Sequence, residues 1–299
     1  MKKFLSKVTL FLIGLVVLDA LVGVGARYFV SHAKGGDTGL SNYICHQMKE
    51  ECIIFGSSRG MHHYDPNIIT DSLSLSCWNC SLDGNGIILM YGRYKLISAR
   101  YNPKMILYDV QEGFDLLKGD NHKYLGGLRY YYDEPSIDTI FWSVDISERF
   151  KMMSNCYRYN SQWLQLISDN VHPLQSDDKG YRPMDKKMFY QPRIIKNKQK
   201  TGYEYDTLKL AFLEKLVVSC KSKGTKLIFA ISPQYNTHND EVYAPLKKIC
   251  KKYNIPLFNH FCDTMFVDNP DFFYDSVHMN RYGATKYTKI LTKEIKHLK

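Results

Sequence analysis

Two short segments at opposite ends of the sequence carry side chains that together could perform nucleophilic chemistry. Residues 56–59 read Gly-Ser-Ser-Arg at the end of an apolar run, and residues 275–278 read Asp-Ser-Val-His. A serine hydroxyl is a weak nucleophile until an imidazole takes its proton and a carboxylate orients that imidazole. Ser58, His278 and Asp275 therefore form a candidate triad of nucleophile, base and orienting acid.

Each segment alone also has an ordinary structural explanation. A Gly-Ser-Ser turn after a strand is commonly a strand-to-helix connection in which a serine caps the helix. Asp275 or Asn280 could begin the final helix, and His278 could pack in the core. The joint occurrence of the segments, in order and at the ends of the expected elements, favours the triad.

These segments resemble the SGNH (GDSL-like) hydrolases, with the nearest likeness to their membrane-anchored branch. That branch includes the D-alanyl transfer protein of teichoic acid pathways and the alginate acetylation proteins. The family's Gly-Asp-Ser motif corresponds here to Gly-Ser-Ser, with Ser58 as the nucleophile. Its Asp-x-x-His-x-Asn-x-x-Gly motif corresponds to residues 275–283, where Asp275, His278 and Asn280 match.

The resemblance also implies an oxyanion hole, with one departure from the family pattern. Gly84, in the second block, matches the glycine whose N–H points into the hole beside the N–H of Ser58. The family's third block supplies an asparagine, but residues 111–115 read Gln-Glu-Gly-Phe-Asp. Gln111 is the substitute amide donor. Losing one such donor typically costs about a hundredfold in rate, so another group supplies the contact, or the enzyme is slow, or it is a specialised transferase.

The resemblance implies a serine-dependent esterase or O-acyltransferase that needs no metal or cofactor. Its expected substrates are acyl esters, acetyl esters above all, of an extracytoplasmic polysaccharide or cell-envelope glycan. The alternative is a non-catalytic subunit of the same fold that binds glycan or assembles with a membrane acyltransferase. The missing third-block asparagine and a charged residue in the anchor, Asp19, favour the alternative, whereas the intact triad argues against it.

Two residues in the motifs could bind substrate. Arg59 and Asn280 are the candidate substrate-binding residues, and a structural pairing of Arg59 with Asp83 is the other interpretation of Arg59. His62 and His63 are adjacent and must point in different directions on any regular element, which argues against a metal site.

The elements that must position these residues alternate between strand and helix. Strands are expected at residues 51–55, 75–79, 105–110, 226–231 and 256–259, and helices at residues 66–72, 84–99, 206–222, 240–252 and 280–298. This alternation predicts an α/β fold: a three-layer, doubly wound, mainly parallel five-stranded sheet of the SGNH or flavodoxin-like kind. Ligands of such sheets bind at the carboxyl ends of the strands, where Ser58, Gly84 and Gln111 follow.

A long segment, residues 115–202, interrupts the alternation and predicts a helical insertion over the carboxyl edge of the sheet. It is rich in aromatic residues, and its second half is basic through Arg182, Lys186, Lys187, Arg193, Lys196, Lys198 and Lys200. The insertion could stack sugar rings and hold anionic groups, or its tyrosines could pack internally while the lysines face solvent. Contact of the basic residues with anionic head groups is a third interpretation.

The N-terminal segment favours a membrane anchor, with the expected boundaries 1–30 for the anchor, 31–50 for a linker and 51–299 for the SGNH-like domain. Residues 8–26 are apolar except for Thr9 and Asp19, close to the ~20 residues that cross a bilayer. The preceding lysines favour an inside N-terminus, which places the domain in the bacterial periplasm or at the cell surface. A cleavable signal peptide ending near Ala26 is the alternative. Asp19 indicates an anchor that tolerates a charge, or a helix contact with a membrane partner.

The composition limits which kinds of protein, binding partner and cysteine site this chain can have. The 299 residues carry a net charge of +10 and are 44% hydrophobic, which excludes a disordered chain. The charge favours anionic glycans or lipid head groups over nucleic acid, for which no motif is present. Eight cysteines are compatible with disulfides outside the cytoplasm. Cys77 and Cys80 have Cys-x-x-Cys spacing without a second pair, so no zinc site is expected.

Overall fold

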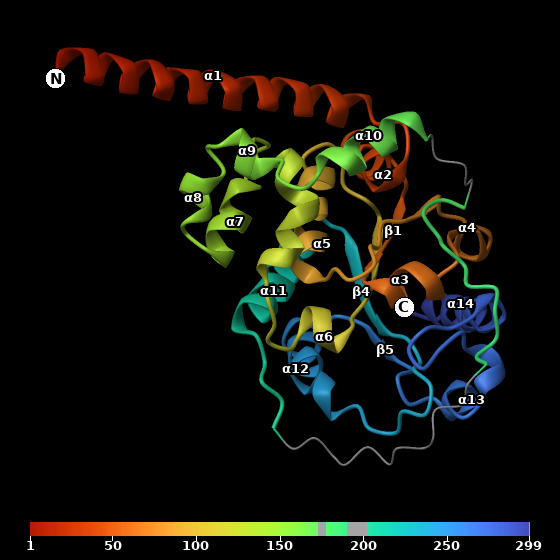
Figure 1. Cartoon of the computed structure of the whole chain (residues 1–299). Helices are drawn as coiled ribbons and strands as arrows, with labels where there is room; N and C mark the ends of the chain where they lie inside the picture. Colours follow the sequence, from red (N-terminus) through yellow and green to blue (C-terminus); the bar gives the residue numbers. More distant parts are fainter. Residues whose placement is uncertain (173–177, 190–201, 299) are drawn as a thin grey trace. The chain divides into compact units, whose positions relative to one another are not determined.

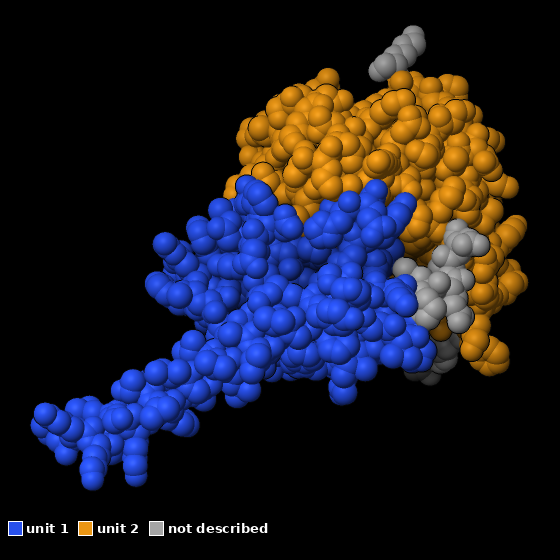
Figure 2. All heavy atoms as spheres, turned by 90° about the horizontal axis from the view of Figure 1, so that it is seen from above, with its two compact units in different colours: residues 1–47, 125–175 blue, residues 48–124, 176–299 orange. Residues whose placement is uncertain are grey.

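The computed structural model describes residues 1–172, 178–189 and 202–298. The chain forms two compact units (Figure 2). Unit 1 comprises Met1–Gln47 with Leu125–Gln175, and unit 2 comprises Met48–Tyr124 with Ser176–Lys299. The boundaries therefore differ from the expected anchor, linker and domain, because residues 31–50 and the middle of the predicted insertion belong largely to the same unit as the N-terminal helix.

Unit 2 is built on a parallel sheet of five strands, as predicted. In spatial order the strands are β2 (Cys77–Asn79), β1 (Cys52–Gly56), β3 (Met105–Asp109), β4 (Lys226–Ile231) and β5 (Leu257–Asn259). The central strands β1 and β3 are buried along their whole length, which explains their continuous apolar sequences. The strand order reverses beside β1, and the crevice at such a reversal is where doubly wound sheets bind ligands.

Helices cover the sheet of unit 2 (Figure 1). The larger ones are α3 (Ser58–His63), α4 (Pro66–Leu73), α5 (Ile87–Ser98), α11 (Thr207–Ser222), α12 (Ala244–Tyr253) and α14 (Arg281–Lys296). α14 packs against α3 and α4, while α11 packs against α5 and α12. The short helices are α6 (Glu112–Asp115) and α13 (Thr264–Val267), with 3₁₀ turns at Glu241–Tyr243 and Pro270–Phe272. Each predicted strand and helix is present with ends shifted by a few residues.

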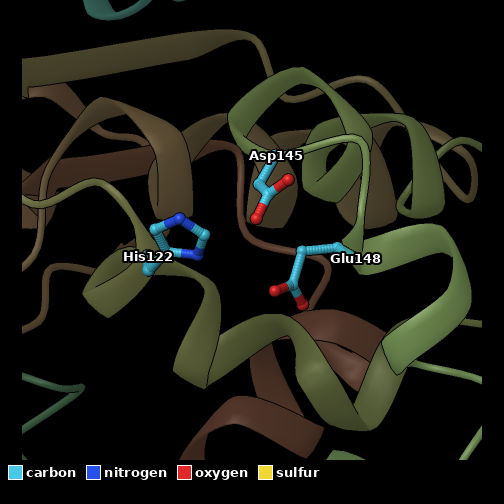
Figure 3. Close-up of side chains that lie close together, drawn as sticks. All are labelled: His122, Asp145 and Glu148. Atoms are coloured by element: carbon cyan, nitrogen blue, oxygen red, sulfur yellow. The ribbon is translucent and has the colours of Figure 1, made fainter.

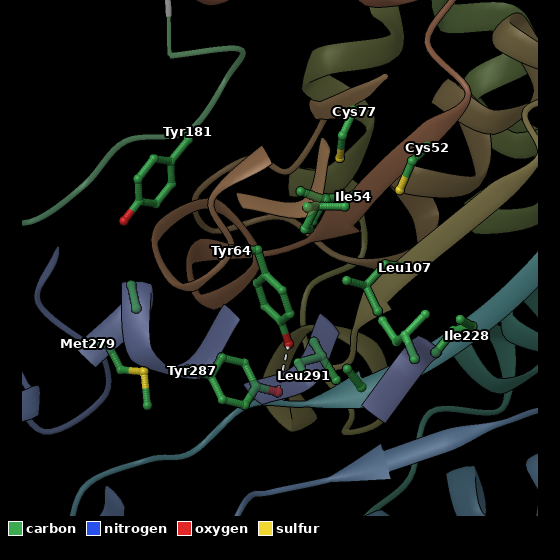
Figure 4. Close-up of a cluster of buried hydrophobic side chains, with 14 of the residues drawn as sticks. Cys52, Ile54, Tyr64, Cys77, Leu107, Tyr181, Ile228, Met279, Tyr287 and Leu291 are labelled. Carbon is green, nitrogen blue, oxygen red and sulfur yellow. Dashed lines mark hydrogen bonds between the residues drawn. The ribbon is translucent and has the colours of Figure 1, made fainter. Parts of the chain in front are cut away.

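A buried cluster joins the sheet to α14 (Figure 4). Ile54, Leu107 and Ile228 contribute from three neighbouring strands, and Tyr287 and Leu291 from α14. Tyr64 lies within the same cluster, and its hydroxyl donates to Asp109 Oδ1 at 2.6 Å. The polar tip of this buried ring is thus satisfied, as burial of a tyrosine requires.

Side-chain caps explain where several helices begin. Asp65 precedes Pro66 and accepts a hydrogen bond from Asn67 N at the start of α4, and Asp206 accepts from the first amides of α11. Asn280 accepts from Gly283 N at 3.0 Å at the start of α14. Such caps satisfy amides that have no partner inside the helix.

Unit 1 is helical. It contains α1 (Lys2–His32), α2 (Gly36–Asn42), a π-helix at Tyr43–Gln47, most of the 3₁₀ segment His122–Tyr131, α7 (Asp138–Val144), α8 (Glu148–Lys151), α9 (Asn155–Arg158) and α10 (Trp163–Val171). The residues expected to form a linker are held by Asp169 of α10. Its side chain accepts from Thr38 N at 3.1 Å, and its carbonyl accepts from the amides of Lys34 and Gly35.

Two carboxylates hold the short helices of unit 1 together. Figure 3 shows Asp145, just before α8, and Glu148, at its first residue. Lys151 Nζ donates to Asp145 Oδ2 and to Glu148 Oε1, each at 3.2 Å. Tyr157 of α9 donates its hydroxyl to Glu148 Oε1 at 2.8 Å, so α8 and α9 are tied to each other.

α1 is long and apolar enough to cross a membrane, judged by its length and composition. All eight cysteines lie in the described part of the chain and are free thiols there, including Cys77 and Cys80. Four residues of the predicted basic run (Arg193, Lys196, Lys198 and Lys200) lie outside the described residues.

Candidate active site

The nucleophile candidate lies at the sharp turn between β1 and α3. Gly56 ends β1 with a φ of +157°, and a Cβ there would lie 3.0 Å from Asp109 O and from Gly60 Cα. A larger residue would therefore push the turn away from β3. Ser58 is the first residue of α3, so its N–H has no acceptor within the helix and can bind a ligand oxygen.

The structure brings the three triad residues into one hydrogen-bonded chain. Ser58 Oγ lies 2.8 Å from His278 Nε2, and His278 Nδ1 lies 2.9 Å from Asp275 Oδ2. The Asp275 carboxylate can only accept a hydrogen bond, so His278 Nδ1 must carry the proton. Nε2 is then left to accept from the hydroxyl of Ser58. This is the tautomer that a serine nucleophile requires.

A tight turn fixes Asp275 in its orienting position. Its Oδ1 also accepts from the backbone amides of Val277 and His278, each at 2.8 Å. Burial acts to raise the pKa of Asp275, but the hydrogen bonds from His278 and from these amides hold it below its ordinary value. The carboxylate therefore stays ionised beside the imidazole.

His63 holds the turn that carries Asp275 and His278. It is wholly buried, and its Nε2 accepts from Met279 N at 2.8 Å, which leaves Nδ1 to donate to Ser232 Oγ at 2.9 Å. Burial lowers the pKa of His63 well below its ordinary value, and the nearby charges of His278 and Arg59 add to the effect. The neutral imidazole of His63 thus holds Met279, the residue that follows His278.

His62 also packs against the ring of His278. Its Nε2 lies 3.0 Å from Asp83 Oδ1, and its Nδ1 lies 2.5 Å from the carbonyl oxygen of Arg182. Both partners are acceptors, so the ring makes both bonds only when both nitrogens carry protons. Burial acts to raise the pKa of Asp83, but His62, followed by Arg182, holds it below its ordinary value. The pair was not predicted, although His62 follows Ser58 by four residues and so shares its helical face.

Gly84 follows β2 and Gln111 follows β3, the two strands that flank β1 in the sheet. Gly84 has a φ of +68°, in a turn closed by the bond from Asn85 N to Leu82 O. The backbone amide of Gln111 donates to Asp115 Oδ2 at 2.7 Å. Only the side-chain amide of Gln111 is left to serve the oxyanion, and within the described residues its Oε1 is buried without a hydrogen-bond partner.

Asp115 is a buried carboxylate that holds the backbone at Gln111 in place. Besides Gln111 N, it accepts from Tyr108 Oη at 2.8 Å and from Ile87 N at 2.7 Å. Burial raises its pKa to about 7, although these hydrogen bonds act to lower it. Only Ile87 lies far from Asp115 in the sequence, 28 positions away, so the link from Asp115 to the start of α5 could not be predicted from a local pattern.

The prediction that Arg59 binds substrate is wrong, and so is its alternative pairing with Asp83. The guanidinium is 0% exposed and donates to Val110 O at 2.7 Å and to Tyr243 Oη at 2.9 Å. Its Nε lies 3.5 Å from Asp109 Oδ2. Arg59 faces inward because the first turn of α3 points that side of the helix at β3.

The prediction that Asn280 binds substrate is also wrong. The side chain is buried, its Oδ1 caps α14, and its Nδ2 donates to Asp271 O at 2.8 Å and to Phe273 O at 3.1 Å. Every polar atom of the amide is used to shape the turn that carries His278.

The described part of the basic segment, residues 178–189, runs along the same turn. Met188 N donates to Phe273 O at 2.8 Å, and Arg281 N donates to Met184 O at 2.7 Å. Lys187 pairs with Asp271 at 3.2 Å. Part of the predicted insertion therefore lies beside the triad in unit 2.

The parallel sheet, the serine after its first strand and the Asp-x-x-His turn before its last helix are the features by which this chain resembles the SGNH (GDSL-like) hydrolases. No family model matches the sequence, and no curated protein matches it.

Three solved structures have a remote likeness to this chain. One is described as an acylhydrolase from Bacteroides fragilis (12% identity, 86% of this chain and 93% of that chain, TM-score 0.42). The others are the acetyl xylan esterase AlAXEase (11%, 82% and 98%, TM-score 0.39) and a catalytic mutant of an acetylxylan esterase from Geobacillus stearothermophilus (12%, 82% and 94%, TM-score 0.40). The function proposed below rests on the site itself.

Proposed function

We propose that this protein is a serine-dependent esterase or O-acyltransferase of the SGNH type. The observation that carries the proposal is the continuous chain from Ser58 Oγ through His278 to Asp275, with bonds of 2.8 and 2.9 Å. The proposed substrates are acyl esters, acetyl esters above all, of an extracytoplasmic polysaccharide or cell-envelope glycan.

The reaction begins when Ser58 Oγ attacks the ester carbonyl while His278 Nε2 takes the hydroxyl proton. The N–H groups of Ser58 and Gly84 hold the resulting oxyanion, with the Gln111 amide as third donor. The C–O bond of the ester then breaks, and the departing alcohol takes the proton from His278. An acyl group remains on Ser58.

The acyl-enzyme is resolved by a second nucleophile that His278 deprotonates in turn. Water completes hydrolysis, whereas a glycan hydroxyl completes acyl transfer. The triad activates water and a glycan hydroxyl in the same way. The pocket that binds the acceptor therefore decides between hydrolysis and transfer. A net charge of +10 suits an anionic glycan or a surface of anionic head groups as the setting.

The proposed location is a membrane, with α1 as an uncleaved anchor and the site outside the cytoplasm. α1 has a mean hydropathy of 2.4 over its most apolar window, and the lysines before it favour an inside N-terminus. A membrane acyltransferase that supplies the acyl group is the partner that fits an O-acyl transfer role.

The test is labelling of the full chain in detergent micelles with a fluorophosphonate, which reacts with activated serines. We expect labelling of the parent protein and its loss in Ser58→Ala and in His278→Ala. Ser57→Ala is the matched control: Ser57 is wholly buried, so this variant should label like the parent. Folded parent protein that does not label would contradict the proposal and favour the non-catalytic subunit.

If labelling succeeds, the acyl group and acceptor can be separated by product analysis. The protein is incubated with an aryl acetate, with and without an acetyl-free polysaccharide, and the glycan is analysed by mass spectrometry. Free acetate alone supports the esterase, and acetylated glycan supports the transferase.

A further inference from the structure

Asp19 interrupts the apolar sequence of α1, and the beginning of α9 binds its carboxylate. Oδ1 accepts from Ser154 Oγ and from Cys156 N, each at 2.8 Å. Oδ2 accepts from Asn155 N at 2.9 Å and from Asn155 Nδ2 at 3.0 Å. Both oxygens are therefore satisfied within this chain, so the charge needs no partner from another membrane protein.

The contact continues along α1 beyond Asp19. Gly23 lies so close to α9 that a Cβ there would be 2.3 Å from Asn155 Oδ1, and Arg27 Nη1 donates to the same oxygen at 3.2 Å. Phe29 meets Trp163 of α10 with ring centroids 6.2 Å apart. The second half of α1 is thus packed against α9 and α10 of unit 1.

This packing begins at a depth that lies inside a bilayer. A hydrocarbon core of ~30 Å requires ~20 helical residues. Counted from Val8, the first residue after the N-terminal lysines, a span of that length ends near Arg27. Asp19 therefore falls within the core, where an unpaired charge is costly. α9 supplies its hydrogen bonds there, and α9 must then lie at the same depth.

The helices of unit 1 that pack beside α1 carry exposed apolar side chains, as a position inside the hydrocarbon core requires. Phe150 and Met153 are 70% and 78% exposed, and both lie at the edge of a cavity of about 950 Å³ that charged residues also line, among them Arg27, Asp133, Glu134 and Arg149. Leu164 is 84% exposed and follows Trp163, which packs on α1. Large apolar side chains left exposed on and next to the helices that pack against α1 indicate a surface that water does not cover in the working state.

We propose that α8, α9 and α10 sit in the outer leaflet of the same bilayer that α1 crosses. Phe150, Met153 and Leu164 lie among the lipid acyl chains, and the exposed Arg149 lies at the level of the lipid phosphates. The occupant of this surface is lipid, because the surface is continuous with a span that lipid already surrounds. This inference rests on the membrane anchoring proposed for α1.

The experiment uses the full chain purified and reconstituted in vesicles of phosphatidylethanolamine and phosphatidylglycerol. A photo-crosslinking phenylalanine analogue replaces Phe150 or Leu164, one position at a time, and lipid adducts are detected by mass spectrometry. Leu12 of α1 is the positive control, because it faces lipid in any membrane-spanning arrangement. Val218 is the negative control, because it is an exposed apolar residue of unit 2.

We expect lipid adducts at Phe150, Leu164 and Leu12, and none at Val218. Adducts at Leu12 alone would overturn the inference while leaving the anchor intact. Adducts at Phe150 that contain only a second copy of the chain would show a protein interface and would also overturn it. Absence of adducts at Leu12 would overturn the anchoring and this inference together, without bearing on the serine chemistry.

Discussion

The ring of His62 stands edge-on to the ring of His278, with centroids 5.5 Å apart and planes at 85°. Asp275 holds one edge of the catalytic imidazole, and His62, itself held by Asp83 and the carbonyl of Arg182, packs against it. The imidazole that takes the proton in the proposed mechanism is therefore positioned both by a hydrogen bond and by a ring contact.

We expect His62→Ala to lower kcat for a small aryl ester by roughly fivefold to tenfold and to leave KM unchanged. An aromatic pair contributes about 0.5–1.5 kcal/mol, and its loss leaves the catalytic ring freer to turn. His62→Phe keeps the ring contact and should retain most of the activity. Steady-state kinetics of both variants give the answer; equal losses would show that the bond to Asp83 matters instead of the contact.

Gln111→Ala should lower kcat by about a hundredfold, since removal of one oxyanion donor costs about that much. The backbone bond from Gln111 N to Asp115 survives the change, so the fold is expected to persist. Gln111→Glu is the matched variant of equal size, and its negative charge should lower kcat further. Kinetics with an aryl acetate measure both, and a Gln111→Ala enzyme as fast as the parent would remove Gln111 from the oxyanion hole.

Arg59→Met should destabilise the protein by about 3–5 kcal/mol, because it leaves Asp109 buried without its cation. Burial already raises the pKa of Asp109, even though Arg59 acts in the opposite direction. Denaturant unfolding of the full chain in micelles measures the loss. A second change, Asp109→Asn, should recover part of it. If Arg59→Met instead raised KM at unchanged stability, the guanidinium would be a substrate ligand after all.

The stability of the protein should depend on pH through Asp115. Burial raises its folded-state pKa to about 7, whereas an aspartate in an unfolded chain titrates near ~3.9. The folded state holds a proton that the unfolded state has lost, so this stabilisation is complete below the unfolded pKa and disappears as pH rises through about 7. Asp115→Asn cannot titrate, and its free energy of unfolding should vary less over this window. Parallel curves for the two proteins would contradict the assignment.

The sheet and the triad could be predicted because their signals are local. Buried parallel strands require continuous apolar runs, and a serine turn or an Asp-x-x-His turn is complete within a few residues. The partners of Arg59 and Asp19 could not be predicted in this way. Asp109 and Asn155 are brought to them by chain segments far away in the sequence. The same reason explains why residues 31–50 resembled a linker, although Asp169 holds part of them.

The bond between Ser58 and His278 joins residues 220 positions apart. During synthesis, Ser58 and the strand before it emerge long before the turn that activates them. Until the last helix closes the sheet, Ser58 is an ordinary alcohol in an unfinished protein. In the proposed mechanism, reactivity therefore appears only together with the completed fold, because a truncated chain has Ser58 without the imidazole that would take its proton.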